Sequence, residues 1–121
     1  MDNELLVHRI IKLLEMINEV MDDLSDKTLE SFQKSNLYMR AVSFSMMQIG
    51  ETMNKMESIL RADYPDVPWK HARDLRNLIV HDYGKVDAET VFFIVKNDLP
   101  ELKEAFIVIK EDLIAKYQIP C

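Results

Sequence analysis

The sequence predicts an all-α protein, an up-and-down bundle of four to six helices that forms one domain over residues 1–121. Only two glycines and four prolines interrupt the chain, which leaves few positions for the hairpin turns of a sheet. Hydrophobic residues make up 48% of the sequence and recur at steps of three and four, as they do on one face of a helix. No internal repeat, low-complexity tract or linker indicates a second domain.

Three helices are predicted in the first half of the chain. Residues 3–24 carry one apolar stripe. Residues 36–62 carry another whose steps alternate between four and three, a pattern suited to lengthwise packing against a second helix. The stripes consist of Leu6, Ile10, Leu13, Ile17, Val20 and Leu24, and of Val42, Met46, Ile49, Met53, Met56 and Leu60. Between them, residues 28–34 are expected to form a short helix with Leu29 and Phe32 facing inward.

The second half opens with two prolines in residues 64–69, a turn that stops one helix and starts the next. We expect the next helix over residues 68–83, with Gly84 as the left-handed residue after its end. Asp87 is then predicted to cap a short helix, and Asp98 to start the final one. The helical spacing is kept by Val91, Phe92 and Ile94 in the first of these and by Leu102, Phe106, Ile109 and Leu113 in the second.

Charge and composition limit the classes of partner that we expect for this protein. The formal net charge is −6, which disfavours broad electrostatic capture of nucleic acid, and no DNA partner is expected. Residues 69–85 nevertheless carry a net charge of +2 and the rest of the chain −8, which suggests a local phosphate contact.

No apolar run approaches the roughly 20 residues that span a bilayer. The first residues are acidic where a signal peptide would be basic, and the single cysteine is Cys121. A cytoplasmic protein with no membrane partner is expected.

The 68–83 helix separates into an apolar and a polar side on a helical wheel of about 100° per residue. The apolar side holds Ala72, Leu75, Leu78 and Ile79, and the other side, next to Arg76, holds Arg73, Asn77, Val80 and His81, with Tyr83 at its edge. Asn77 and His81 are i,i+4 neighbours, so one face would present an arginine, an amide and an imidazole together. This geometry requires the helix to continue as far as His81.

These side chains suit metal-free cleavage of RNA, in which the ribose 2′-hydroxyl attacks the adjacent phosphorus. His81 can transfer protons near neutral pH, and Arg76 offers fixed N–H donors to the charge that develops on the phosphorane. Asn77 could orient the phosphate or the imidazole. One helix offers one histidine, whereas acid and base roles often need two groups, so a homodimer across a two-fold axis is expected. By spacing alone, however, such a pair is more often a solvated surface feature.

Other chemistries find little support in the sequence. No Glu-x-x-His pattern, paired cysteines, glycine-rich phosphate loop or G-x-S-x-G elbow occurs, so neither a metal site nor a cofactor is expected. His8 and His71 are assigned no role.

The chain resembles the HEPN superfamily and, within it, the HepT-like toxin ribonucleases of HepT–MntA toxin–antitoxin pairs. Arg76, Asn77, His81 and Tyr83 match the R-x4-H-x-Y signature, written "RN…HxY". Four further matches occur in order along the chain: "IGE" at residues 49–51, "YPDIPW" at 64–69 with Val67 in place of the isoleucine, "G-x-V-D" at 84–87 and "DLPEL" at 98–102. One departure is Arg73-Asp74-Leu75, where small residues often precede the motif.

The resemblance implies a HEPN-like helical bundle and the toxin of a type VII toxin–antitoxin system. It implies a homodimeric, metal-independent endoribonuclease acting on tRNA or mRNA, with Arg76 and His81 as catalytic residues. Asn77 would support them. Arg73, which the helical wheel and not the resemblance places beside Arg76, is expected to bind the RNA phosphate together with Asn77. Tyr83 would receive AMP from an MntA-like nucleotidyltransferase antitoxin, which would silence the toxin. The alternative, which the net acidity favours, is a non-catalytic helical partner that binds a nucleotide or presents substrates to a nucleotidyltransferase.

Overall fold

The computed structural model describes residues 2–81 and 87–120, and the side chains of these residues except those at positions 77–81. Every element in this part of the chain is helical, which confirms the predicted all-α class. In order, the elements are α1 (Asn3–Asp23), α2 (Leu29–Gln33), α3 (Asn36–Leu60), α4 (Trp69–His81), α5 (Ala88–Phe93), the π-helical turn η1 (Ile94–Asp98) and α6 (Leu99–Tyr117). Among the described residues, no helix is both long and apolar enough to cross a membrane.

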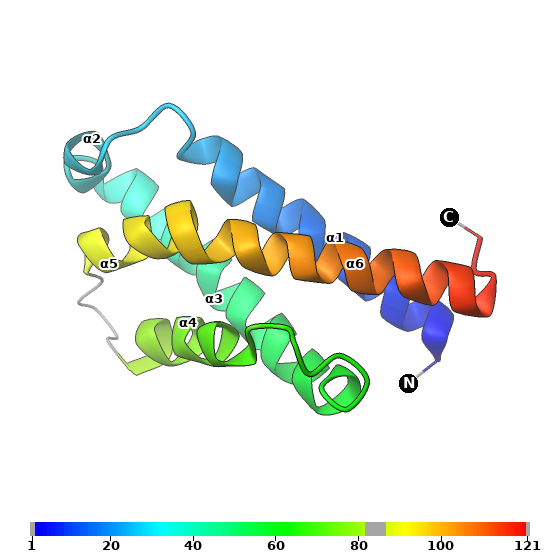
Figure 1. Ribbon diagram of the computed structural model, residues 1–121. Coiled ribbons are helices and arrows are strands. Elements are labelled where there is room, and N and C mark those ends of the chain that lie inside the picture. Colours follow the sequence, from blue (N-terminus) through cyan, green and yellow to red (C-terminus); the bar gives the residue numbers. More distant parts are fainter. Residues whose placement is uncertain (1, 82–86, 121) are drawn as a thin grey trace.

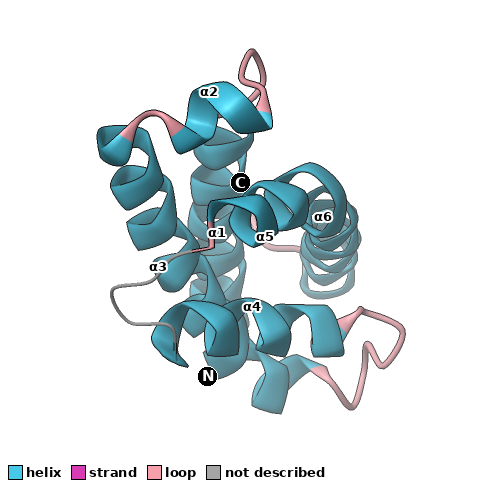
Figure 2. Cartoon of the chain, turned by 90° about the vertical axis from the view of Figure 1, so that its left-hand side faces the viewer, coloured by secondary structure: helices cyan, strands magenta, loops and turns pink. Residues whose placement is uncertain are grey.

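Three long helices form the body of the molecule. α1 packs against α6 and α3, while α4 lies along α3 in the most extensive contact of the fold. The two ends of the chain lie at the same end of the bundle (Figure 1). α2 lies at one edge of the bundle and α4 at the opposite edge (Figure 2). The predicted apolar stripes of α1 and α3 are all buried, because the core forms where α1 meets α3 and α6 and where α3 meets α4.

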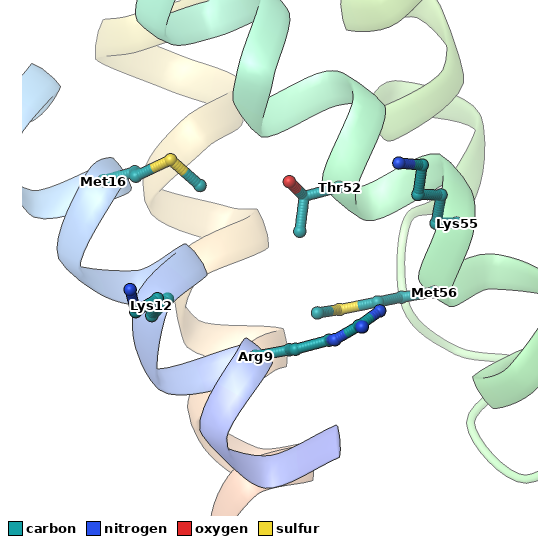
Figure 3. Close-up of a pocket in the computed structure, with 6 residues that line it drawn as sticks. All are labelled: Arg9, Lys12, Met16, Thr52, Lys55 and Met56. Atoms are coloured by element: carbon teal, nitrogen blue, oxygen red, sulfur yellow. The ribbon is translucent and has the colours of Figure 1, made fainter. Parts of the chain in front are cut away.

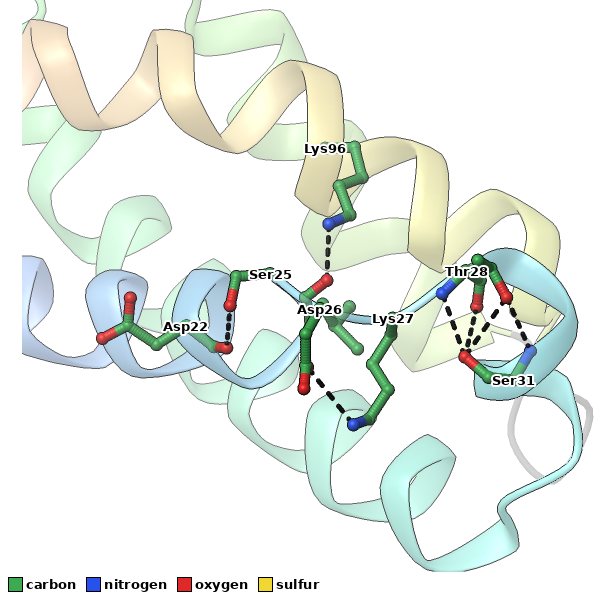
Figure 4. Close-up of polar contacts among 8 residues, drawn as sticks. Asp22, Ser25, Asp26, Lys27, Thr28, Ser31 and Lys96 are labelled. Atoms are coloured by element: carbon green, nitrogen blue, oxygen red, sulfur yellow. Dashed lines mark hydrogen bonds and ion pairs between the residues drawn. The ribbon is translucent and has the colours of Figure 1, made fainter.

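Side chains define most of the helix starts. Asp2, Ser35 and Asp87 each accept a hydrogen bond from a backbone N–H in the first turn of the helix that follows. Thr28 and Ser31 form a reciprocal capping box at α2, shown in Figure 4. In the same view, Lys96 donates to the carbonyl of Leu24 just beyond α1, which ties the end of α1 to η1.

The expected start of the last helix at Asp98 is wrong in one respect. Asp98 has helical dihedral angles (φ −79°, ψ −38°) and makes no capping hydrogen bond. α5, η1 and α6 instead form one continuous run, in which the N–H of Leu99 bonds to the carbonyl of Ile94 five residues earlier. Because Pro100 has no N–H and its ring crowds the preceding turn, a wider π turn just before it lets the helix continue.

Candidate active site

α4 is held in place by its apolar side, as the wheel predicted. Trp69, Ala72 and Leu75 are each 4% exposed or less. The side chains of Leu78 and Ile79, the other two residues of that side, lie outside the described residues. Burial of the first two turns fixes the rotation of α4, and this rotation turns Arg73 and Arg76 toward α3.

The proline-rich turn fixes where α4 begins. The indole of Trp69 donates to the carbonyl of Tyr64 at 2.9 Å and stacks edge-on against Phe106 of α6. The Tyr64 hydroxyl donates to Asp112, also on α6. Burial is the larger cause and this hydrogen bond the second, and together they raise the pKa of the Tyr64 phenol above its usual range. The segment that resembles "YPDIPW" is therefore an anchor between α4 and α6, several turns from the signature residues.

A glycine allows α3 and α4 to approach closely beneath Arg76. Gly50 is buried in the middle of α3, and a Cβ atom at this position would lie 2.8 Å from Leu75 Cδ2 and 3.0 Å from the Cα of Arg76. Any side chain here would push α4 outward at the arginine. Gly50 therefore determines how near the backbone of Arg76 lies to α3.

The residue after this glycine binds the arginine. Arg76 Nε donates to Glu51 Oε1 at 3.0 Å, and the two side chains are 36% and 40% exposed. Since this bond uses the Nε edge of the guanidinium, the terminal nitrogens keep donors for another ligand. Arg76 is thus oriented by α3 and still reachable from solvent.

Arg73 is engaged in a similar way one turn earlier. Its guanidinium donates to Glu57 of α3. The side chain of Glu57 is only 12% exposed and also accepts a hydrogen bond from Arg61 at 3.4 Å. Arg73 would have to share this carboxylate with any phosphate it contacts. Its role as a phosphate ligand remains a prediction.

The other signature residues lie partly outside the described residues. α4 extends to His81, so the spacing on which the wheel depends holds along the backbone. The side chains of Asn77 and His81 lie outside the described residues, as do all of Tyr83 and the predicted end of the helix at Gly84. Their roles remain predictions.

Sequence reasoning missed the two carboxylates that hold the arginines. Glu51 belongs to the "IGE" segment, which was matched only by resemblance to the family. No sequence pattern indicated a role for Glu57. Among the described residues, no group of three or more histidine, cysteine or acidic side chains is arranged to hold a metal ion. The described part of the site therefore consists of two guanidinium groups oriented by carboxylates, an arrangement that can bind and polarise a phosphodiester.

Comparisons with known proteins agree on one family. The family model described as "Ribonuclease HepT-like" matches residues 10–109. A protein of Methanocaldococcus jannaschii named "Putative RNase" is 32% identical over 82% of this chain and 83% of its own length. Another from that organism, "Gamma-glutamylcyclotransferase and putative RNase", is 30% identical over 93% of this chain, which spans about half (49%) of that relative. "Probable ribonuclease HepT" of Thermococcus cleftensis is 27% identical over 77% of this chain and 88% of its own length. No solved structure matches the chain.

Proposed function

The chain belongs to the HepT-like ribonuclease family, and from this premise we propose that it is a metal-independent endoribonuclease acting on tRNA or mRNA. The observation that carries the proposal is the guanidinium of Arg76, which Glu51 holds through Nε and whose terminal nitrogens form no hydrogen bond with the residues that the structure describes. It lies on the same helix as His81, five residues earlier. An oriented permanent cation beside a proton-transfer group is what cleavage by an internal 2′-hydroxyl needs.

In the proposed mechanism, the 2′-hydroxyl of the ribose attacks the adjacent phosphorus as an imidazole removes its proton. The terminal nitrogens of Arg76 donate to the non-bridging oxygens as negative charge builds on the phosphorane. A second protonated imidazole gives its proton to the departing 5′-oxygen, leaving a 2′,3′-cyclic phosphate. Asn77 and Arg73 contact the phosphate and hold it in line.

The two imidazoles come from two copies of the chain in a homodimer. Leu37, Phe44 and Glu51 follow one another at intervals of seven on α3, so they share one outward face of that helix. Leu37 is 72% and Phe44 58% exposed, although both are large apolar side chains. This apolar face leads directly to the Glu51–Arg76 pair, and a second copy covering it would bring the two motifs together.

Within a toxin–antitoxin pair, Tyr83 is the proposed site at which an MntA-like nucleotidyltransferase adds AMP. The adenylyl phosphate would add negative charge and bulk seven residues along the chain from Arg76, the residue proposed to bind the RNA phosphate. Tyr83→Phe should therefore keep ribonuclease activity and escape neutralisation by the partner. Mass spectrometry of the modified protein tests the site, since AMP found on another residue would contradict the assignment.

The direct test is cleavage of an RNA pool by the wild type and by two single variants, with EDTA present throughout. His81→Ala and Arg76→Ala should each lose at least about 10²-fold in rate while the far-UV circular dichroism spectrum stays unchanged. His8→Ala, which removes an exposed histidine from α1, is the matched control and should retain full activity. Cleavage that survives in His81→Ala would refute the nuclease proposal.

The net charge of −6 favours the alternative of a non-catalytic partner of a nucleotidyltransferase. That protein would bind the nucleotidyltransferase or its nucleotide and would leave the RNA pool intact at every protein concentration. The same assay therefore separates the two functions.

A further inference from the structure

We infer that a cationic groove between α1 and α3 binds the phosphate backbone of single-stranded RNA, next to the bond cleaved at Arg76. This inference rests on the proposed ribonuclease function and names where its substrate lies. The groove, called here the α1–α3 groove, is lined by Arg9, Lys12 and Met16 of α1 and by Thr52, Lys55 and Met56 of α3.

The groove combines charged walls with an apolar floor. Its volume is about 270 Å³, and Figure 3 shows Met16 and Thr52 pointing into the gap between the two helices. Arg9 extends from α1 across toward Met56 of α3. Such a combination suits a nucleotide chain, because the cations can reach phosphates while flexible methionine side chains accept a ribose or base of any sequence.

Three cations without an ion-pair partner among the described residues lie around this groove. Arg9, Lys12 and Lys55 are all exposed, and none of them forms an ion pair with any residue in the described part of the chain. On a chain whose net charge is −6, three cations around one hollow repel one another without an internal counter-ion. A bound polyanion would relieve this repulsion and release its own counter-ions.

The groove is continuous with the candidate active site. A second hollow of about 430 Å³ shares Met16 and Thr52 with it and continues along α3 to Gln48 and Glu51. From Gln48 to Met56, α3 rises by about 12 Å, which is long enough for about two nucleotides. Glu51, at the far end, is the residue that holds Arg76 Nε. Since Arg76 neutralises this carboxylate, the path from the three cations to the guanidinium ends in paired charge, which would not repel RNA.

The experiment measures RNA binding without cleavage. The probe is a 2′-O-methyl oligonucleotide of about eight nucleotides, which has no free 2′-hydroxyl and cannot be cut. The groove variant is Arg9→Gln, Lys12→Gln, Lys55→Gln in the full chain. Its matched control is Lys34→Gln, Lys103→Gln, Lys116→Gln, which removes the same charge from positions that do not line the groove, at the end of α2 and on α6.

The groove variant should bind about tenfold more weakly near 0.1 M salt, as expected for three partly exposed contacts to phosphate. The slope of log K against log salt should fall by about 2, because each phosphate contact to a single strand contributes about 0.7. The control variant should lose less than about threefold and keep the wild-type slope. Lys55→Gln alone should lower the slope by about 0.7, which gives a second test with minimal change to the protein.

Three results would overturn the inference: equal losses in the groove and control variants, no loss in the groove variant, or no wild-type binding to the probe. If the groove variant keeps its RNA affinity but fails to bind the antitoxin, the groove is a protein contact instead. The proposed ribonuclease activity is tested separately from RNA binding in the groove. A wild type that binds through the groove but never cleaves ordinary RNA would refute the proposed function and leave the groove standing.

Discussion

The residues that matter most at the candidate site are two arginines, each held by a carboxylate on the neighbouring helix. Arg76 binds Glu51 and Arg73 binds Glu57 across the seam between α3 and α4. The Arg76–Glu51 pair is exposed enough to contribute only about 0.2–1 kcal/mol to stability, whereas the side chain of Glu57 is only 12% exposed. Both pairs reduce the number of rotamers open to each guanidinium. In the proposed mechanism, this would align the donors of Arg76 before the RNA binds.

Removing the carboxylate that holds Arg76 should therefore affect catalysis more than folding. Glu51→Ala should lower kcat for RNA cleavage about 10- to 100-fold with little change in KM, because the loss of alignment is felt mainly in the transition state. Its unfolding free energy should change by less than about 1 kcal/mol. Glu57→Ala frees Arg73 in the same way and is the matched control, with a loss of less than about fivefold expected.

Steady-state cleavage of a defined RNA and urea unfolding of both variants supply the measurements. The positioning role of Glu51 is wrong if Glu51→Ala and Glu57→Ala have equal kcat, or if the two lose activity only in proportion to lost helix.

At the scale of the elements, the sequence predicted what depends on local periodicity. α1 and α3 begin at the expected residues and α2 begins one residue later, and all three end within two residues of the expected ends, because apolar spacing and capping side chains are local signals. The end of α5 was less predictable. Asp98 was expected to start a new helix, but the π turn before Pro100 lets the existing helix continue. A continuous helix leaves fewer backbone groups without hydrogen-bond partners than a helix end followed by a new helix start.

The ionic pairs could not be predicted in the same way. Whether Glu51 reaches Arg76 depends on the register of α3 against α4, which no local pattern encodes. The useful sequence signal was Gly50, an unfavourable residue in a helix interior, beside that glutamate. Its presence indicates that another backbone approaches at this point.

The packing of α3 against α4 at this glycine leads to a prediction about the element pair. Gly50→Val should destabilise the protein by about 1–3 kcal/mol, because its added atoms overlap Leu75 and the backbone of Arg76. It should also reduce RNA cleavage, since Arg76 moves away from Glu51. Asn54→Val places the same side chain one turn later on the exposed side of α3 and should change stability by no more than about 0.5 kcal/mol.

Thermal unfolding and cleavage assays on these two valine variants test whether the close approach of α3 and α4 positions Arg76. Wild-type stability and activity in Gly50→Val would show that α4 can shift without consequence, and that the close approach has no role in positioning the arginine.

For the whole molecule, the surface combines an acidic body, a local basic groove and an exposed apolar face on α3. Weak general attraction to RNA is expected from a net charge of −6, so binding would rely on the few contacts at the groove and at Arg76. The apolar face of Leu37 and Phe44 is more typical of a protein contact than of an RNA contact. A homodimer on this face would place one motif from each copy at a common site.

Such a shared site predicts that one defective copy inactivates a mixed dimer. A dimer of one wild-type chain and one His81→Ala chain has a single signature imidazole, whereas the proposed mechanism uses two. After the two chains are co-expressed at equal levels, about half of the dimers should be mixed and about a quarter should be wild type. We therefore expect the rate of RNA cleavage to be about a quarter of that of the same amount of wild-type protein. Native mass spectrometry gives the fraction of mixed dimers, and Phe44→Asp in an otherwise wild-type chain should abolish the dimers and the activity together. A rate of about one half would show that each copy cleaves RNA with its own histidine alone, and that the site is not shared.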